Sequence, residues 1–266
     1  MSTVTHTPRY WIALALIGII GGVLSGMFGI GGGIIMVPLL ISFAGMNQKQ
    51  ASATSLVAII PTAVVGSLTY FANGQIDFLA GGIIAVGAIV GALIGSYLLK
   101  RIPLVWLRWM FIVLILVVAA RMLFIEPERG DQLEMSGLLA LGYVALGLVM
   151  GIASGLFGIG GGIIAVPSLV AIFGMSDLIA KGTSLLVMIP TGITGTISNV
   201  RARLVNVGAG LVVGIAATLA AVPGVALALL LPPRVSAILF AALLLVAAIQ
   251  LTIKAIKAQR ADRAAR

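Results

Sequence analysis

The chain has 266 residues, of which 61% are hydrophobic and only 9% are charged. An ordinary soluble domain carries roughly 25% charged residues, so this composition excludes a soluble globular protein and predicts that lipid is the main solvent. The net charge of +9 comes from basic residues at the ends of apolar segments and in the C-terminal tail, a distribution typical of cytoplasmic loops and not of a nucleic-acid-binding surface.

Eight apolar segments follow one another along the chain, and most have the roughly 20 residues that a helix needs to cross a bilayer. They cover residues 10–44, 51–71, 78–99, 104–125, 135–173, 179–200, 207–231 and 235–253. The first segment is interpreted as a retained helix and not as a signal peptide, because the apolar sequence continues through its glycines. The first and fifth segments are too long for one crossing, and a glycine cluster interrupts each. We therefore predict an all-α polytopic membrane protein.

The chain contains one sequence unit twice. Residues 25–40 read SGMFGIGGGIIMVPLL and residues 154–169 read SGLFGIGGGIIAVPSL, which are identical at thirteen of sixteen positions at an offset of 129 residues. The same offset aligns Thr54-Ser55-Leu56 with Thr183-Ser184-Leu185 without a gap. The predicted organisation is a cytoplasmic tail over 1–9, a first repeat over 10–125, a polar linker over 126–136, a second repeat over 137–254 and a basic cytoplasmic tail over 255–266.

The basic residues predict how the two repeats are oriented, because Lys and Arg concentrate in cytoplasmic loops. Lys100 and Arg101 follow the third apolar segment of the first repeat, whereas Arg201 and Arg203 lie at the earlier loop of the second. This exchange favours inverted repeats of four to five transmembrane or re-entrant helices each. Both termini and twelve of the sixteen Lys and Arg residues are then cytoplasmic. A parallel arrangement, in which each broken segment crosses once, stays open.

The glycine clusters are the first candidate binding site. Adjacent glycines disfavour continuous helix by about 1 kcal/mol each, and unwound backbone inside a membrane must be buried in protein or line a polar cavity. Free N–H groups before a helix favour an anion. The candidate residues are Gly29, Gly31, Gly32, Gly33 and Pro38 in the first repeat and Gly158, Gly160, Gly161, Gly162 and Pro167 in the second. The alternative is that these glycines only permit close helix packing.

Other glycines recur every four residues, which predicts helix surfaces that pack closely. They are Gly18, Gly22 and Gly26; Gly87, Gly91 and Gly95; and Gly147, Gly151 and Gly155.

Four hydroxyl residues and one lysine are the next candidates. Thr54 and Ser55 recur as Thr183 and Ser184, and hydroxyls inside a span bond either a substrate or their own helix backbone. Lys181, two residues before Thr183, supplies positive potential for an anion if it faces a cavity. If it does not, it is an ordinary interfacial lysine.

The remaining titratable residues exclude several kinds of chemistry. The sequence has no cysteine and one histidine, His6, in the N-terminal tail, so no metal or cofactor is expected. All seven acidic residues lie in loops, at segment ends or in the tail. An intramembrane enzyme and a carboxylate-lined cation path are therefore disfavoured, and an anion is the favoured substrate.

The duplicated S-G-x-F-G-I-G-G-G-I-I-x-V-P segment, followed by A-x-x-T-S-L and a later proline, resembles the TauE/SafE sulfite exporter family over nearly the whole chain. The resemblance implies a permease of the bacterial inner membrane that exports sulfite or an organosulfonate. It also places the glycine clusters, the two prolines and the paired hydroxyls at the family's typical positions. An anion channel and a non-transporting membrane scaffold are the alternatives, and the sequence leaves the identity of the anion and the oligomeric state open.

Overall fold

The computed structural model describes residues 8–124 and 137–264, and within these ranges the chain forms ten helices. They are α1 (Pro8–Phe28), α2 (Gly33–Phe43), α3 (Gln48–Ala72), α4 (Phe78–Arg101), α5 (Leu104–Phe124), α6 (Gly137–Phe157), α7 (Gly162–Ala171), α8 (Asp177–Arg201), α9 (Val207–Leu230) and α10 (Pro233–Ala264). Seven of these described helices have the length and composition to cross a membrane. His6 and the expected linker over 126–136 lie outside the described residues.

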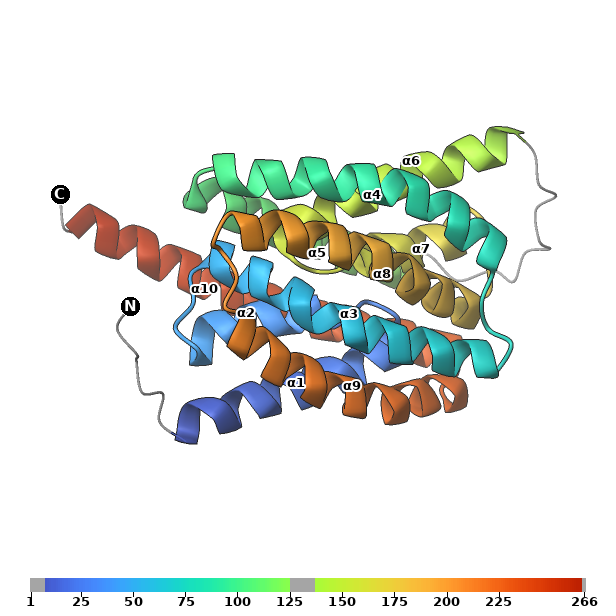
Figure 1. Ribbon diagram of the computed structural model, residues 1–266, viewed down its shortest axis with the longest axis horizontal. Helices are drawn as coiled ribbons and strands as arrows, with labels where there is room; N and C mark the ends of the chain where they lie inside the picture. Colours follow the sequence, from blue (N-terminus) through green and yellow to red (C-terminus); the bar gives the residue numbers. More distant parts are fainter. Residues whose placement is uncertain (1–7, 125–136, 265–266) are drawn as a thin grey trace.

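The helices lie side by side along one common direction, with the start of α1 and the end of α10 at the same end of the bundle (Figure 1). Helices α3 and α8 pack together near the centre. Gly66 of α3 faces Leu185 of α8, whereas Gly195 of α8 faces Leu56 of α3. Because the contacts run in opposite order along the two helices, α3 and α8 are antiparallel.

Glycines bring two other helix pairs into backbone contact. Helix α1 packs against α9, and α4 packs against α6. A Cβ atom built on Gly22 would lie 2.1 Å from the carbonyl oxygen of Ala217, and one on Gly91 would lie 2.2 Å from that of Leu148. Only glycine permits so close an approach, so the predicted packing role of the four-residue glycine spacing is confirmed.

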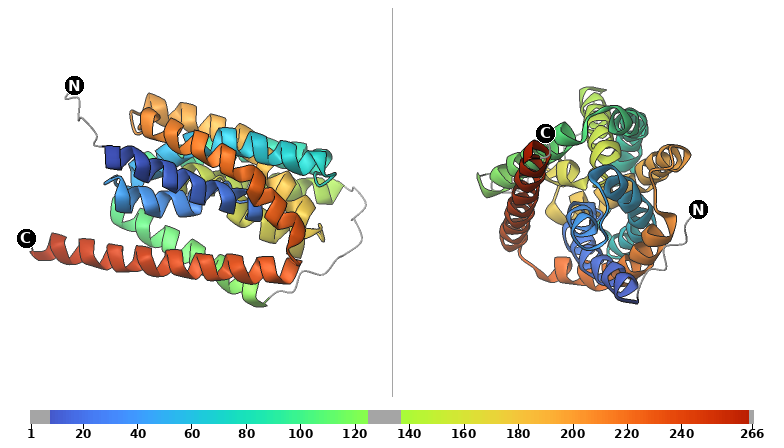
Figure 2. Two further views of the ribbon diagram at one scale, coloured as in Figure 1. Left: turned by 90° about the horizontal axis from the view of Figure 1, so that it is seen from below. Right: turned by 90° about the vertical axis from the view of Figure 1, so that its left-hand side faces the viewer.

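Helices α5 and α10 pack against each other on one side of the bundle (Figure 2). Phe111 of α5 stacks on Phe157 of α6, with ring centroids 5.2 Å apart, and Phe240 of α10 stacks on Phe28 of α1 at 4.9 Å. These two pairs are equivalent at the 129-residue offset. Large apolar side chains such as Leu138, Leu219 and Leu230 are exposed on the outer surface, as expected for a surface covered by lipid.

Candidate functional site

Both glycine clusters interrupt the helix. Helix α1 ends at Phe28 and α2 begins at Gly33, while α6 ends at Phe157 and α7 begins at Gly162. We call residues 29–32 the first glycine loop and residues 158–161 the second. Gly29, Gly31 and Gly32 have φ angles of 68°, 72° and 71°, in the left-handed region that glycine adopts without strain. The aligned positions Gly158, Gly160 and Gly161 have φ angles of 70°, 78° and 87°.

The two glycine loops lie directly against each other. A Cβ atom on Gly33 would lie 2.3 Å from the carbonyl oxygen of Gly158, and one on Gly162 would lie 2.5 Å from that of Gly29. Gly31 and Gly160 both face the side chains of Ile59 and Met188. These two residues are each the twelfth of the 25 residues of α3 and α8, so the loops meet halfway along the two central helices.

The loops contain backbone N–H groups without an acceptor. Gly29 donates to the carbonyl of Ser25 at 2.8 Å, and Ile35 and Met36 donate to that of Gly32. Among the described residues, no hydrogen bond uses the N–H groups of residues 30–34, and the same holds for residues 159–163. Successive backbone N–H groups in turn conformations form concave surfaces that bind anions.

Each glycine loop is bonded by one serine from the other half of the chain. Ser55 of α3 donates to the carbonyl of Gly158 at 2.6 Å, and Ser184 of α8 donates to the carbonyl of Gly29. Both serines are fully buried. The structure therefore places Ser55 and Ser184 at the glycine loops, and it pairs their hydroxyl hydrogens with protein carbonyls.

The neighbouring threonines point elsewhere. Thr54 accepts a hydrogen bond from the N–H of Asn206 at 3.1 Å, and Thr183 accepts one from the N–H of Asp77 at 3.0 Å. Asp77 and Asn206 are the N-cap residues of α4 and α9. Thr54 and Thr183 therefore hold the starts of these helices and do not contact the glycine loops through their hydroxyls. Pro38 and Pro167 lie inside α2 and α7, more than one turn beyond the loops.

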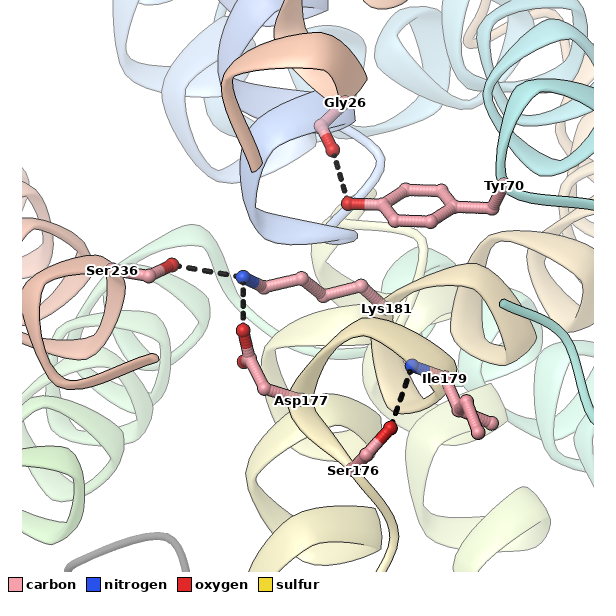
Figure 3. A network of polar contacts seen from close by, with 7 residues as sticks. All are labelled: Gly26, Tyr70, Ser176, Asp177, Ile179, Lys181 and Ser236. Atoms are coloured by element: carbon pink, nitrogen blue, oxygen red, sulfur yellow. Dashed lines mark hydrogen bonds and ion pairs between the residues drawn. The ribbon is translucent and has the colours of Figure 1, made fainter. Parts of the chain in front are cut away.

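Lys181 is buried, with 2% of its side chain exposed, and its ammonium group is paired (Figure 3). Its Nζ lies 2.6 Å from Oδ2 of Asp177 and 2.8 Å from Oγ of Ser236 on α10. The backbone of Lys181 packs on the first glycine loop, because a Cβ atom on Gly29 would lie 2.6 Å from its Cα. The sequence predicts a role for this lysine, and the spacing of four residues between Asp177 and Lys181 within one helix is the signal that could have identified its partner.

The structure adds polar residues that the sequence analysis did not select. Ser25 and Ser154 are the first residues of the duplicated motif, and their hydroxyls are buried without a hydrogen-bond partner among the described residues. The same is true of the Gln48 Nε2, Ser52 Oγ and Asn199 amide atoms. Buried polar atoms of this kind need water or a ligand as a partner.

Comparison with known proteins identifies one family of membrane transporters. The sequence profile of the family described as Sulfite exporter TauE/SafE matches residues 2–128 and, separately, residues 143–266. A Bacillus subtilis (strain 168) protein named "Probable membrane transporter protein YunE" is 28% identical over 220 residues, covering 74% of this chain and 80% of its own length.

Two further relatives, from Xylella fastidiosa (strain Temecula1) and Haemophilus influenzae (strain KW20), are each named "Probable membrane transporter protein". They are 31% identical over 192 residues and 30% identical over 190 residues. The matches cover 71% and 69% of this chain and 73% and 71% of the relatives. The separate matches to the two parts of the chain agree with the internal repeat read from the sequence.

Proposed function

The chain belongs to the sulfite exporter TauE/SafE family, and we propose on this premise that it is a permease that exports sulfite or a small organosulfonate across the bacterial inner membrane. Membership makes the chain a membrane transporter and not an enzyme. The choice of anion and the direction of movement are our proposal. The observation that supports an anion as the substrate is the meeting of two glycine loops, with their unpaired N–H groups, halfway along α3 and α8.

An anion suits this place for electrostatic reasons. Each glycine loop precedes a helix, α2 or α7, whose N-terminal end carries a partial positive charge. An anion held between the loops would accept hydrogen bonds from N–H groups of residues 30–34 and 159–163. The hydroxyls of Ser25 and Ser154, one turn before the loops, are additional donors. A cation would find no carboxylate in either loop.

We further infer that the two repeats are inverted relative to each other. Helices α3 and α8 hold aligned positions of the two repeats and run antiparallel. Helices α2 and α7 have 11 and 10 residues, and at 1.5 Å per residue they extend only about half of the roughly 30 Å hydrocarbon core. Gly32 packs back against Gly21 of α1, so α1 and α2 form a re-entrant hairpin. Inverted repeats around broken helices are a recurring transporter design.

The end of the bundle that holds both termini is assigned to the cytoplasm. Lys100, Arg101 and Arg201 lie at this end, where Nζ of Lys100 contacts the carbonyl of Ser198 at 3.2 Å. Lys and Arg concentrate on the cytoplasmic side of membrane proteins. Transport then consists of a rocking movement of the two halves that exposes the glycine loops first to the cytoplasm and then to the outside.

The test uses purified protein in liposomes loaded with labelled sulfite or a small organosulfonate. We expect efflux that saturates with concentration and is accelerated by unlabelled anion on the opposite side, because a carrier exchanges its substrate. A current that rises linearly with voltage would favour an anion channel. Leakage equal to that of protein-free liposomes, across a broad panel of anions, would contradict the proposal and favour a scaffold.

A further inference from the structure

The two repeats differ in charge at two pairs of aligned positions. The 129-residue offset aligns Asp177 with Gln48 and Lys181 with Ser52. Lys181, Gln48 and Ser52 are all at most 2% exposed. One repeat therefore places an ion pair between the buried Lys181 and the partly buried Asp177, whose side chain is 16% exposed, in the first turns of α8. The other repeat buries two neutral side chains in the first turns of α3.

The fold itself does not require this ion pair. Moving two charges out of water costs about as much as their attraction returns, so a neutral replacement of similar volume is often as stable. The first repeat forms the corresponding helix start without charges, since Gln48 and Ser52 occupy the aligned positions at the start of α3. A charged pair kept on one side of a duplicated structure therefore points to a function and not to stability.

The ion pair belongs to a set of contacts between helices at the end of the bundle opposite the termini (Figures 1 and 3). Lys181 joins α8 to α10 through Ser236, which is 2% exposed. Nearby, the hydroxyl of Tyr70 on α3 donates to the carbonyl of Gly26 on α1 at 2.8 Å. Tyr70 also packs on Gly182, the residue after Lys181, where a Cβ atom would lie 2.9 Å from the tyrosine Cβ.

The residues aligned with Tyr70, Lys181 and Ser236 at the 129-residue offset lie at the opposite end of the bundle and make none of these contacts. The counterpart of Tyr70 is Asn199, whose amide atoms have no partner among the described residues. The counterpart of Ser236 is Leu107, which cannot bond Ser52. Helices at the end with Lys181 are thus joined by polar contacts that the equivalent positions at the other end lack, where Lys49 and Lys100 make different ones.

We propose that Asp177, Lys181 and Ser236 form an ion-exchange latch at this end of the transport path. In the closed state Lys181 pairs with Asp177 and Ser236. When this end opens, the ammonium group exchanges these partners for the substrate anion, which arrives from the first glycine loop, on which the Lys181 backbone packs. Return of the Asp177 carboxylate to Lys181 then displaces the anion outward, so the latch favours release at this end. This inference rests on the proposed anion transport.

The first test needs no substrate and uses the lack of native cysteine. Ser236→Cys is introduced as a reporter in the full chain, and its reaction with an uncharged maleimide is followed in detergent, where both ends are accessible. The reporter is then combined with Asp177→Gln and Lys181→Ser, which installs the neutral pair that the first repeat already folds with. We expect the thiol to react at least about tenfold faster, because the closed contact between α8 and α10 is lost.

Leu107→Cys is the matched control reporter, because Leu107 is the buried counterpart of Ser236. Its rate should stay unchanged by the same double substitution. The proposal is contradicted if the double substitution leaves the Ser236→Cys rate unchanged, or if it raises the rates of both reporters equally. It is also wrong if Ser236→Cys alone reacts as fast as Asn73→Cys, which lies in an exposed turn.

The second test measures flux in liposomes with Asp177→Asn. We expect this variant to half-saturate at a lower anion concentration and to reach a lower maximal rate, because the anion no longer competes with a carboxylate for Lys181. Saturable flux with both parameters unchanged would contradict the exchange. A thiol rate that responds as expected, with no flux of any anion, would contradict the proposed function and leave the latch as a structural contact.

Discussion

Gly33 and Gly162 show how much the candidate site depends on single residues. Each is the first residue of a short helix, and each faces the backbone of the other repeat's glycine loop. Neither residue has a positive φ angle. Their requirement for glycine therefore comes from the close approach of two backbones and not from chain conformation.

We expect Gly33→Ala to separate the two glycine loops, because its Cβ would lie 2.3 Å from the carbonyl oxygen of Gly158. Overpacking of this kind costs about 1–3 kcal/mol. The thermal unfolding midpoint in detergent, followed by helical circular dichroism, should fall, and anion flux should fall with it. Gly208→Ala in the first turn of α9 is the control, since its nearest neighbour would be 3.8 Å away. Equal midpoints for the two variants would contradict this account.

The sequence identified the residues of the glycine loops but not what they touch. Thirteen identities in sixteen positions predicted that both clusters would have the same local structure, and the φ angles agree. The crossed bonds from Ser55 and Ser184 join residues that are 103 and 155 positions apart. Such distant pairs depend on how the helices pack, which a single sequence does not specify.

At the scale of the helices, the glycine surfaces set the distances between elements. Helix α4 contacts α6 through Gly87, Gly91 and Gly95, each of which meets a carbonyl oxygen of α6. In a membrane, helices gain no hydrophobic driving force by associating, so close van der Waals contact provides much of the attraction. Helices α1 and α9 also pack closely through glycines that meet carbonyl oxygens of the partner helix.

We expect Gly91→Ala to weaken the contact between α4 and α6, because its Cβ would lie 2.2 Å from the carbonyl oxygen of Leu148. Gly82→Ala on the same helix is the control, since nothing lies within 4 Å of its added Cβ. The control should gain up to about 1 kcal/mol from better helix propensity, whereas Gly91→Ala should lower the unfolding midpoint. A midpoint raised in both variants would show that the two helices can move apart without cost.

The predicted apolar segments match the helices where composition changes sharply. Segments 78–99 and 207–231 correspond to α4 and α9, whose N-caps are Asp77 and Asn206. The pattern is less informative at the C-terminus, where α10 continues to Ala264, well past the apolar segment that ends at residue 253. Basic residues are good helix formers, so the loss of apolar character there marks the end of the lipid-facing part and not the end of the helix.

At the scale of the whole molecule, sequence repetition and helix direction together support the proposal that the two repeats are inverted. The repetition was visible in the sequence, but orientation had to be inferred from a few basic residues. The antiparallel packing of α3 and α8 supplies independent support. Single-sequence reasoning could not provide it, because a repeat has the same sequence whichever way it crosses the membrane.

Membrane orientation can be measured with single cysteines at the helix ends. We expect an impermeant maleimide applied to intact cells to label Asn73→Cys, at the end of α3, and not Lys100→Cys. Ala202 is the counterpart of Asn73 in the second repeat, and inversion places it in the cytoplasm. Ala202→Cys should therefore stay unlabelled until the cells are opened. Labelling of both Asn73→Cys and Ala202→Cys in intact cells would show that the repeats are parallel.

The crossed bonds from Ser55 to Gly158 and from Ser184 to Gly29 bear on how such a protein can arise. A polypeptide with only one unit could form these crossed bonds only with a second copy inserted upside down. A half-length precursor would thus need dual topology, with equal numbers of molecules in each orientation. Gene fusion makes that ratio permanent. Each unit is then free to change separately, and Lys181 and Ser52 are an aligned pair that differs.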